Sequence, residues 1–144
     1  MDRVLLVLGA VAVAGSVAAL LGRRGAPPAA NTHHVPVQLD RRDFVRPDAP
    51  WLVVTFSAAT CDTCAGVVER AALLESDEVA VQEVEVGADP ALHGRYSIDG
   101  VPTLLVADSS GAVVDSFLGP VTAADLWGSV ARARNAAESE AGEG

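Results

Sequence analysis

A near-continuous run of β-branched and aromatic side chains, "WLVVTFS" at residues 51–57, constrains the fold more than any other feature of the sequence. It does not alternate between apolar and polar residues, which is typical of a strand covered on both faces in a mostly parallel sheet. A helical stretch follows from Cys61 to about Glu75, and a second strand, "VAVQEVEV", follows at 79–86. A strand, a helix and a strand in this order predict an α/β fold.

The pattern between residues 35 and 134 completes one domain of about 100 residues, long enough to bury its own core. We predict a short strand at 35–39, a helix from Asp89 to about Tyr96, a hairpin of 103–107 and 112–119, and a last helix from Thr122 to about Arg134. Asp89 is a suitable N-cap because Pro90 follows it at the first helical position. The expected architecture is a central mixed sheet flanked by helices.

The amino-terminal part of the chain contains a long uncharged segment. Residues 4–21, "VLLVLGAVAVAGSVAALL", would reach about 27 Å as an α-helix, close to the thickness of a hydrocarbon core. We therefore predict a single transmembrane anchor over 4–21 and a linker over 22–34. A cleaved signal peptide is the alternative, although its apolar region would be shorter and Asp2 stands where a basic residue is typical.

Arginine residues indicate the side of the membrane on which the domain lies. Arg23 and Arg24 follow the apolar segment closely and Arg41 lies farther on, whereas Arg3 alone precedes it. Because basic residues stay on the cytoplasmic side, this bias favours a single-pass membrane protein with a cytoplasmic domain.

The chain as a whole is acidic. Its net charge of −9 argues against nucleic acid as a partner, because few cations are present to neutralise phosphates. The carboxyl-terminal residues 135–144, "NAAESEAGEG", are acidic and lack large apolar side chains. We therefore predict a disordered tail there.

The segment "TCDTCAGVVERA", residues 60–71, contains the two cysteines of the chain, Cys61 and Cys64. Cys61 falls at or just before the first helical turn, where free N–H groups and the helix dipole favour a thiolate. Cys64 shares an apolar helical stripe with Val67 and Leu74, so it should point inward. An exposed thiol of lowered pKa beside a buried partner suits thiol–disulfide exchange, in which Cys61 attacks and Cys64 resolves the mixed disulfide.

Two stretches together, "LVVTFSAATCDTC" at 52–64 and "YSIDGVPTLLV" at 96–106, resemble the thioredoxin family. In that family a buried strand leads into a Cys-x-x-Cys helix, and a Tyr-x-Ile-x-x-x-Pro-Thr segment follows with a cis-proline facing the cysteines. The matching residues are Tyr96, Ile98, Pro102 and Thr103. The resemblance covers about residues 35–134. It implies a thioredoxin-like oxidoreductase without an organic cofactor, with protein disulfides as substrates and an upstream dithiol as electron donor.

The resemblance also implies roles for residues of the site. Cys61 would be the nucleophile and Cys64 the resolving cysteine, with a cis peptide before Pro102. The backbone of Val101 would bind an extended substrate.

The sequence departs from the family pattern around the cysteines. Thr60 stands where the family usually has Trp, and Asp62-Thr63 replaces Gly-Pro. We expect these three residues to contact substrate. The negative charge of Asp62 opposes a thiolate at Cys61, which makes a dithiol more reducing, so a disulfide reductase is predicted rather than an oxidase.

A buried carboxylate and its lysine partner are also replaced. Their positions in the family align with Thr55 and Glu83. We hypothesise that Glu83 is a relocated buried acid that accepts the proton of Cys64, with its pKa raised by desolvation. The alternative is that Glu83 points to water at a strand edge.

Two other classes of protein remain open. The segment 60–71 also resembles heavy-metal-associated domains, in which Thr-Cys-x-x-Cys opens a helix and two thiolates hold Cu(I). Those domains lack a Val-Pro-Thr segment. The order of elements after Glu75 also favours the resemblance to thioredoxin, and in that case no metal site is expected. The third class is a thioredoxin-fold interaction module without turnover, which turnover on a disulfide substrate would distinguish from an enzyme.

Overall fold

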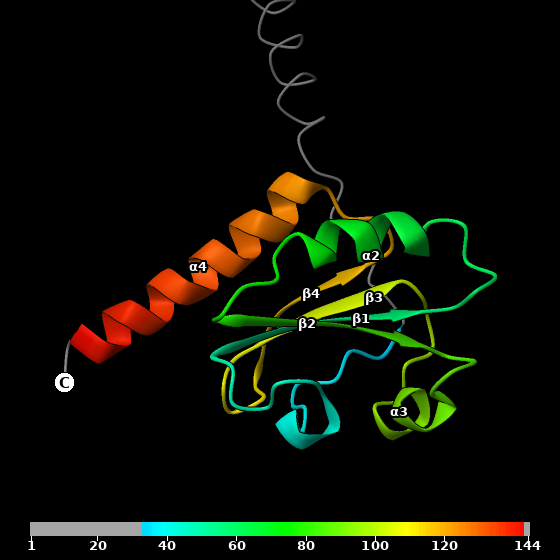
Figure 1. Ribbon diagram of the computed structural model, residues 1–144, viewed down its shortest axis with the longest axis horizontal. Helices are drawn as coiled ribbons and strands as arrows, with labels where there is room; N and C mark the ends of the chain where they lie inside the picture. Colours follow the sequence, from blue (N-terminus) through cyan, green and yellow to red (C-terminus); the bar gives the residue numbers. More distant parts are fainter. Residues whose placement is uncertain (1–32, 143–144) are drawn as a thin grey trace, which may run out of the picture. The chain divides into compact units, whose positions relative to one another are not determined.

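The computed structural model describes residues 33–142, and Figure 1 shows a sheet with helices on both faces. The four strands lie in the order β2-β1-β3-β4. They are β1 (Trp51–Ser57), β2 (Val79–Glu85), β3 (Thr103–Ala107) and β4 (Val113–Leu118). The helices are α2 (Cys64–Ala72), α3 (Pro90–Arg95), α4 (Ala123–Gly142) and the short 3₁₀ helix η1 (Arg41–Asp43). β1 pairs with β2 in parallel and with β3 antiparallel, so the predicted mixed α/β sheet is confirmed.

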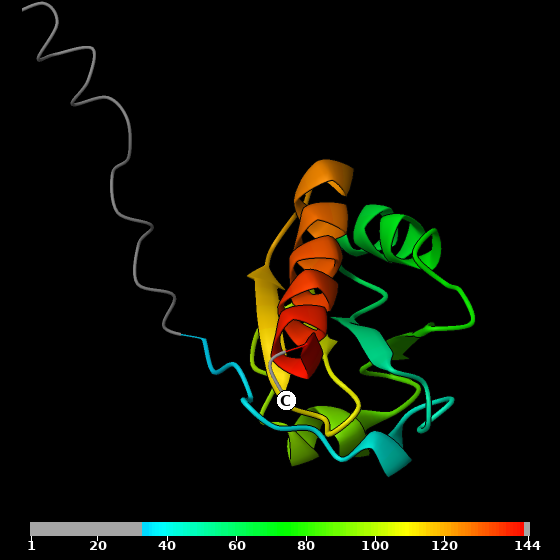
Figure 2. The same ribbon diagram turned by 90° about the vertical axis from the view of Figure 1, so that its left-hand side faces the viewer.

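Strand β1 separates two halves of the core because its side chains alternate between the faces of the sheet. Trp51 and Val53 pack with residues of α2 and α4. Val54 and Phe56 pack on the opposite face, where Leu92 of α3 joins them. All seven residues of β1 are buried, as its near-continuous apolar run predicted. Figures 1 and 2 both show α2 and α4 on one side of the sheet and α3 on the other.

The strand expected at residues 35–39 is absent from the described part of the chain. A single bridge between Gln38 and Ala112 replaces it. The alternation of apolar and polar residues predicted a strand, but Pro36 has no N–H to donate to a ladder, and η1 follows at once. This segment therefore packs beside the hairpin without lengthening the sheet.

The carboxyl-terminal helix is longer than expected. We predicted its end near Arg134 and a disordered tail over 135–144, but α4 continues to Gly142. The prediction of disorder is therefore wrong for residues 135–142. Alanine and glutamate are strong helix formers, and adding them to an existing helix avoids the cost of nucleation. Helix propensity therefore decided the structure of residues 135–142, although this segment lacks large apolar side chains.

The predicted anchor over 4–21 and the linker up to residue 32 lie outside the described residues. Within residues 33–142, none of the helices is both long enough and apolar enough to cross a membrane.

Arg41 is a buried cation that donates to three backbone carbonyls in two segments of the chain. The residue is only 7% exposed. Its guanidinium donates to the carbonyl oxygens of Ala49 and Asp108, at 2.9 Å each, and to that of Arg46 at 3.3 Å. The segment before β1 is thereby fastened to the start of the β3–β4 turn. Arg41 contributed to the sequence analysis only as a positive charge, so its structural role is a new finding.

Candidate active site

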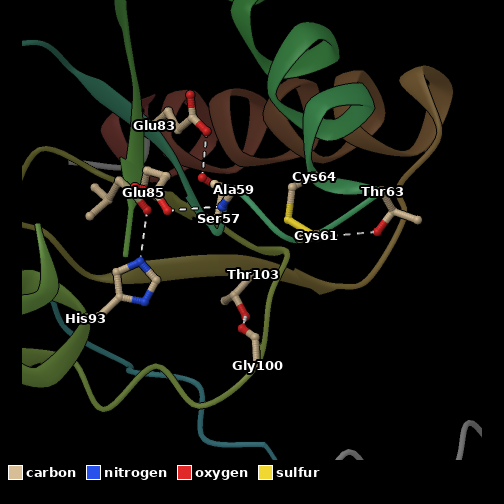
Figure 3. Close-up of a disulfide and its surroundings, with 11 residues drawn as sticks. Ser57, Ala59, Cys61, Thr63, Cys64, Glu83, Glu85, His93, Gly100 and Thr103 are labelled. Carbon is tan, nitrogen blue, oxygen red and sulfur yellow. Dashed lines mark hydrogen bonds between the residues drawn. A yellow bond between two sulfur atoms is a disulfide. The ribbon is translucent and has the colours of Figure 1, made fainter. Parts of the chain in front are cut away.

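The two cysteines lie between the end of β1 and the first turn of α2. Cys61 follows β1 in a turn in which its N–H donates to the carbonyl of Ala58 at 3.0 Å. Cys64 begins α2 and is 3% exposed, whereas Cys61 is half-buried. The two are joined in a disulfide with Cα atoms 5.4 Å apart, as Figure 3 shows. The outward Cys61 and inward Cys64 expected from the helical stripe are therefore both present.

The helix begins later than expected, and this changes the surroundings of Cys61. The prediction placed its start at Cys61, but residues 61–63 form a turn and α2 covers Cys64–Ala72. Thr63 is the N-cap residue, and its side chain makes no capping hydrogen bond within the described structure. The Thr63 hydroxyl instead lies 3.7 Å from the Cys61 sulfur (Figure 3). It is therefore available as a donor to a thiolate.

The residues expected to contact substrate flank Cys61 in the sequence and lie on the surface. Thr60, Asp62 and Thr63 are all exposed. Their side chains are therefore free to meet a molecule that approaches Cys61. Their roles in substrate binding stay predictions.

The loop that ends in Pro102 reaches the same edge of the sheet as the cysteines. Thr103, the first residue of β3, pairs with Phe56 near the end of β1, so the loops after β1 and before β3 are neighbours. The Val101–Pro102 peptide is cis, as the resemblance implied. Val101 is half-buried and Pro102 is buried. The Thr103 hydroxyl donates to the Gly100 carbonyl at 2.7 Å, and Figure 3 shows this hydrogen bond.

Glu83 is not the buried acid that we hypothesised. Its side chain is exposed because β2 is an edge strand. One carboxylate oxygen accepts a hydrogen bond from the buried Ser57 hydroxyl at 2.5 Å (Figure 3). Thr55 takes the buried position beneath α2, and its hydroxyl has no hydrogen-bond partner in residues 33–142. The premise of desolvation at Glu83 is therefore wrong. Its role as acceptor of the Cys64 proton stays a prediction.

Glu85 holds the loop that leads from β1 to Cys61. Its carboxylate accepts the N–H of Ala59 at 3.0 Å and that of Ala88 at 2.9 Å. The N–H groups of Gly87, Ala59 and Ala88 lower the pKa of Glu85 from its usual value, because hydrogen bonds to a carboxylate favour its charged form. Ala59 lies two residues before Cys61, so one side chain on β2 anchors the approach to the cysteine turn.

Ser57 and Glu85 were not predicted at the site, although the sequence carries a signal for both. In "QEVEV" of β2, Glu83 and Glu85 alternate with apolar residues, so both lie on one face near the carboxyl end of the strand. A parallel neighbour ends at the same edge of the sheet, and β1 ends there at Ser57. The parallel pairing, once known, brings these polar groups to the cysteine loop.

The fold and site define a class of protein: a mixed α/β sheet with a cysteine pair at the start of a helix and a cis-proline loop beside it. The chain belongs to the thioredoxin family, because the family model for Thioredoxin matches residues 38–132.

Solved structures agree with this family assignment. A thioredoxin from Fasciola hepatica is 26% identical, with a TM-score of 0.51, and the match covers 60% of this chain and 83% of that one. The structure of a malarial protein, 16% identical with a TM-score of 0.53, matches 58% of this chain and 96% of that one, and supports the fold alone. No curated protein matches the chain.

Proposed function

We propose that the protein reduces disulfides in other proteins by thiol–disulfide exchange. The observation that carries this proposal is the half-buried Cys61 bonded to the buried Cys64 at the start of α2. Exchange needs one sulfur that a substrate can reach and a second that only the first can reach. The family supports a redox role for such a pair in general, and the direction of electron flow is our proposal.

The proposed cycle starts from the reduced pair. The Cys61 thiolate attacks one sulfur of a substrate disulfide, and the other substrate sulfur leaves as a thiolate that takes a proton. Cys64 then loses its proton and attacks the Cys61 sulfur, which forms the Cys61–Cys64 disulfide and releases the second substrate thiol. Two electrons have passed to the substrate, and an upstream dithiol restores the reduced pair. The Thr63 hydroxyl, 3.7 Å from the Cys61 sulfur, would donate to the attacking thiolate.

The substrate would lie across the surface between the cysteine turn and the Pro102 loop. The exposed side chains of Thr60, Asp62 and Thr63 would contact it on one side. The backbone of Val101 would hold an extended segment of it on the other, with Pro102 shaping the groove.

We further propose that the apolar residues 4–21 anchor the protein in a membrane with its domain on the cytoplasmic side. The support is the uncharged length of that segment and the arginines that follow it. Substrates would then be protein disulfides at or near the membrane. The net charge of −9 supports proteins, rather than nucleic acids, as partners.

A redox titration tests the direction of electron flow. Residues 31–144 would be equilibrated in glutathione and dithiothreitol buffers, the thiols trapped, and the two states counted by intact mass. We expect a cooperative two-electron midpoint in the range of reducing thioredoxins, about −270 mV. A midpoint near about −120 mV would reverse the assignment to an oxidant. If no intramolecular disulfide formed at any potential, the exchange mechanism would fail and Cu(I) binding by the two thiolates would be the next measurement.

Replacing Asp62 by Asn should make the pair less reducing. The substitution removes a negative charge next to Cys61, which stabilises the thiolate and so the reduced form. Asp62 is exposed, so we expect only a small positive shift of the midpoint, about 10–20 mV. Glu69→Gln is the matched control, because Glu69 is another exposed carboxylate, farther along α2. An equal shift in both variants would contradict a local effect of Asp62.

A further inference from the structure

Residues that lead into the domain lie against the loop that precedes Pro102. His33 Nδ1 is 3.1 Å from a carboxylate oxygen of Asp99. The backbone N–H of His34 reaches the same carboxylate, 3.3 and 3.5 Å from its two oxygens. These contacts join positions separated by 66 and 65 residues in the chain. His33 and His34 therefore both contact the Asp99 carboxylate, in the loop before Pro102.

The imidazole of His33 also covers the backbone of Gly100. A methyl group added at Gly100 would lie 3.0 Å from His33 Nδ1 and 3.2 to 3.3 Å from its ring carbons. Such distances are closer than ordinary van der Waals contact, so the ring occupies the space that a side chain at position 100 would need. Glycine at this position leaves room for the ring where it lies.

The position of this contact relates it to substrate binding. Asp99 and Gly100 directly precede Val101 and Pro102, the segment to which we assign the extended substrate. Within the fold, the hydroxyl of the buried Thr103 donates to the Gly100 carbonyl at 2.7 Å. The half-exposed His33 contacts the same segment. The orientation of the Val101 backbone therefore depends on both supports.

We infer that His33 and Asp99 are positioning residues, which hold the Asp99–Gly100 segment so that the Val101 backbone is oriented for an extended substrate. This inference rests on the proposed function. Neither residue touches the reacting sulfurs in this role, so they act on substrate affinity and leave the chemical step unchanged.

The contact between His33 and Asp99 can be removed without unfolding the protein. The side chains of His33 and Asp99 are 51% and 54% exposed. An ion pair or hydrogen bond at that exposure contributes little to global stability. Ordering a loop before the substrate binds can nevertheless improve affinity, because the bound conformation is then already populated.

The test compares His33→Ala with His34→Ala in the full chain. His34 reaches Asp99 through its backbone N–H, which alanine retains, so this variant is a matched control. Steady-state reduction of a peptide disulfide would give KM and kcat, and amide hydrogen exchange would report on Gly100 and Val101. We expect His33→Ala to raise KM about three- to tenfold with kcat unchanged and to speed exchange at both amides. His34→Ala should match the wild type.

Two more variants complete the test. Gly100→Ala should crowd the imidazole and raise KM less than His33→Ala does, because the half-exposed ring can shift by a small distance. His33→Asn, whose amide nitrogen takes the place of Nδ1, should restore much of the affinity that His33→Ala loses. Unchanged KM and unchanged amide exchange in His33→Ala would overturn the inference. If the wild type itself failed to reduce the substrate, the proposed function would fall. The exchange rates at Gly100 and Val101 would still decide whether His33 orders the loop.

Discussion

Cys61→Ser is expected to abolish disulfide reduction, with a loss in kcat/KM of at least about 10³-fold. A serine hydroxyl is almost wholly protonated near neutral pH, so no anion is available to attack the substrate disulfide. The half-buried position of Cys61 makes it the sulfur that a substrate meets first. The measurement is the release of thiols from a peptide disulfide, with dithiothreitol as the electron donor.

Cys64→Ser is the matched control for this loss, because it should stop the cycle one step later. Its Cys61 can still attack, but nothing resolves the mixed disulfide, so a covalent adduct with the substrate should accumulate and appear in the intact mass. An adduct on Cys61→Ser but not on Cys64→Ser would reverse the two roles. A wild-type protein that binds the peptide without releasing thiols would instead be an interaction module.

Arg41→Ala is expected to lower the free energy of unfolding by about 3 kcal/mol. The substitution leaves the carbonyl oxygens of Ala49, Asp108 and Arg46 without their common donor. Arg41 is 7% exposed, so water does not readily replace the lost hydrogen bonds. Equilibrium unfolding in urea, followed by circular dichroism, would measure the change.

Arg42→Ala provides the comparison for Arg41, because it removes the same kind of side chain one residue later. The Arg42 side chain is 85% exposed and pairs with Asp40 at the surface. Its loss should therefore cost much less stability than the loss of Arg41. Equal losses in the two variants would contradict the role of Arg41 as a buried link between segments.

The sequence predicted those parts of the fold that depend on local pattern. The apolar run 51–57 became a fully buried strand, because such a run satisfies a position between two layers in any α/β fold. The stripe that begins at Cys64 placed that sulfur against the sheet. The resemblance to the thioredoxin family implied a cis peptide before Pro102, and the structure has it.

The errors arose where pairing or helix propensity decided the outcome. The position of Glu83 within β2 was correct, but its exposure depends on β2 lying at the sheet edge, which no local pattern contains. Residues 35–39 alternate like a strand but find only one bridge. The polar composition of residues 135–144 predicted disorder, but alanines and glutamates in this segment extend α4 to Gly142. The contact of His33 with Asp99 spans 66 residues and has no local signature.

The burial of Cys64 has a consequence for oxidative damage. A peroxide that enters from solvent meets Cys61 before Cys64, because the latter is 3% exposed. Oxidation of the Cys61 thiolate gives a sulfenic acid, which condenses with the adjacent Cys64 thiol, forms the disulfide and releases water. This condensation competes with further oxidation to the sulfinic acid, which is not readily reversed. The arrangement that we propose for disulfide reduction would therefore also keep Cys61 recoverable after oxidation.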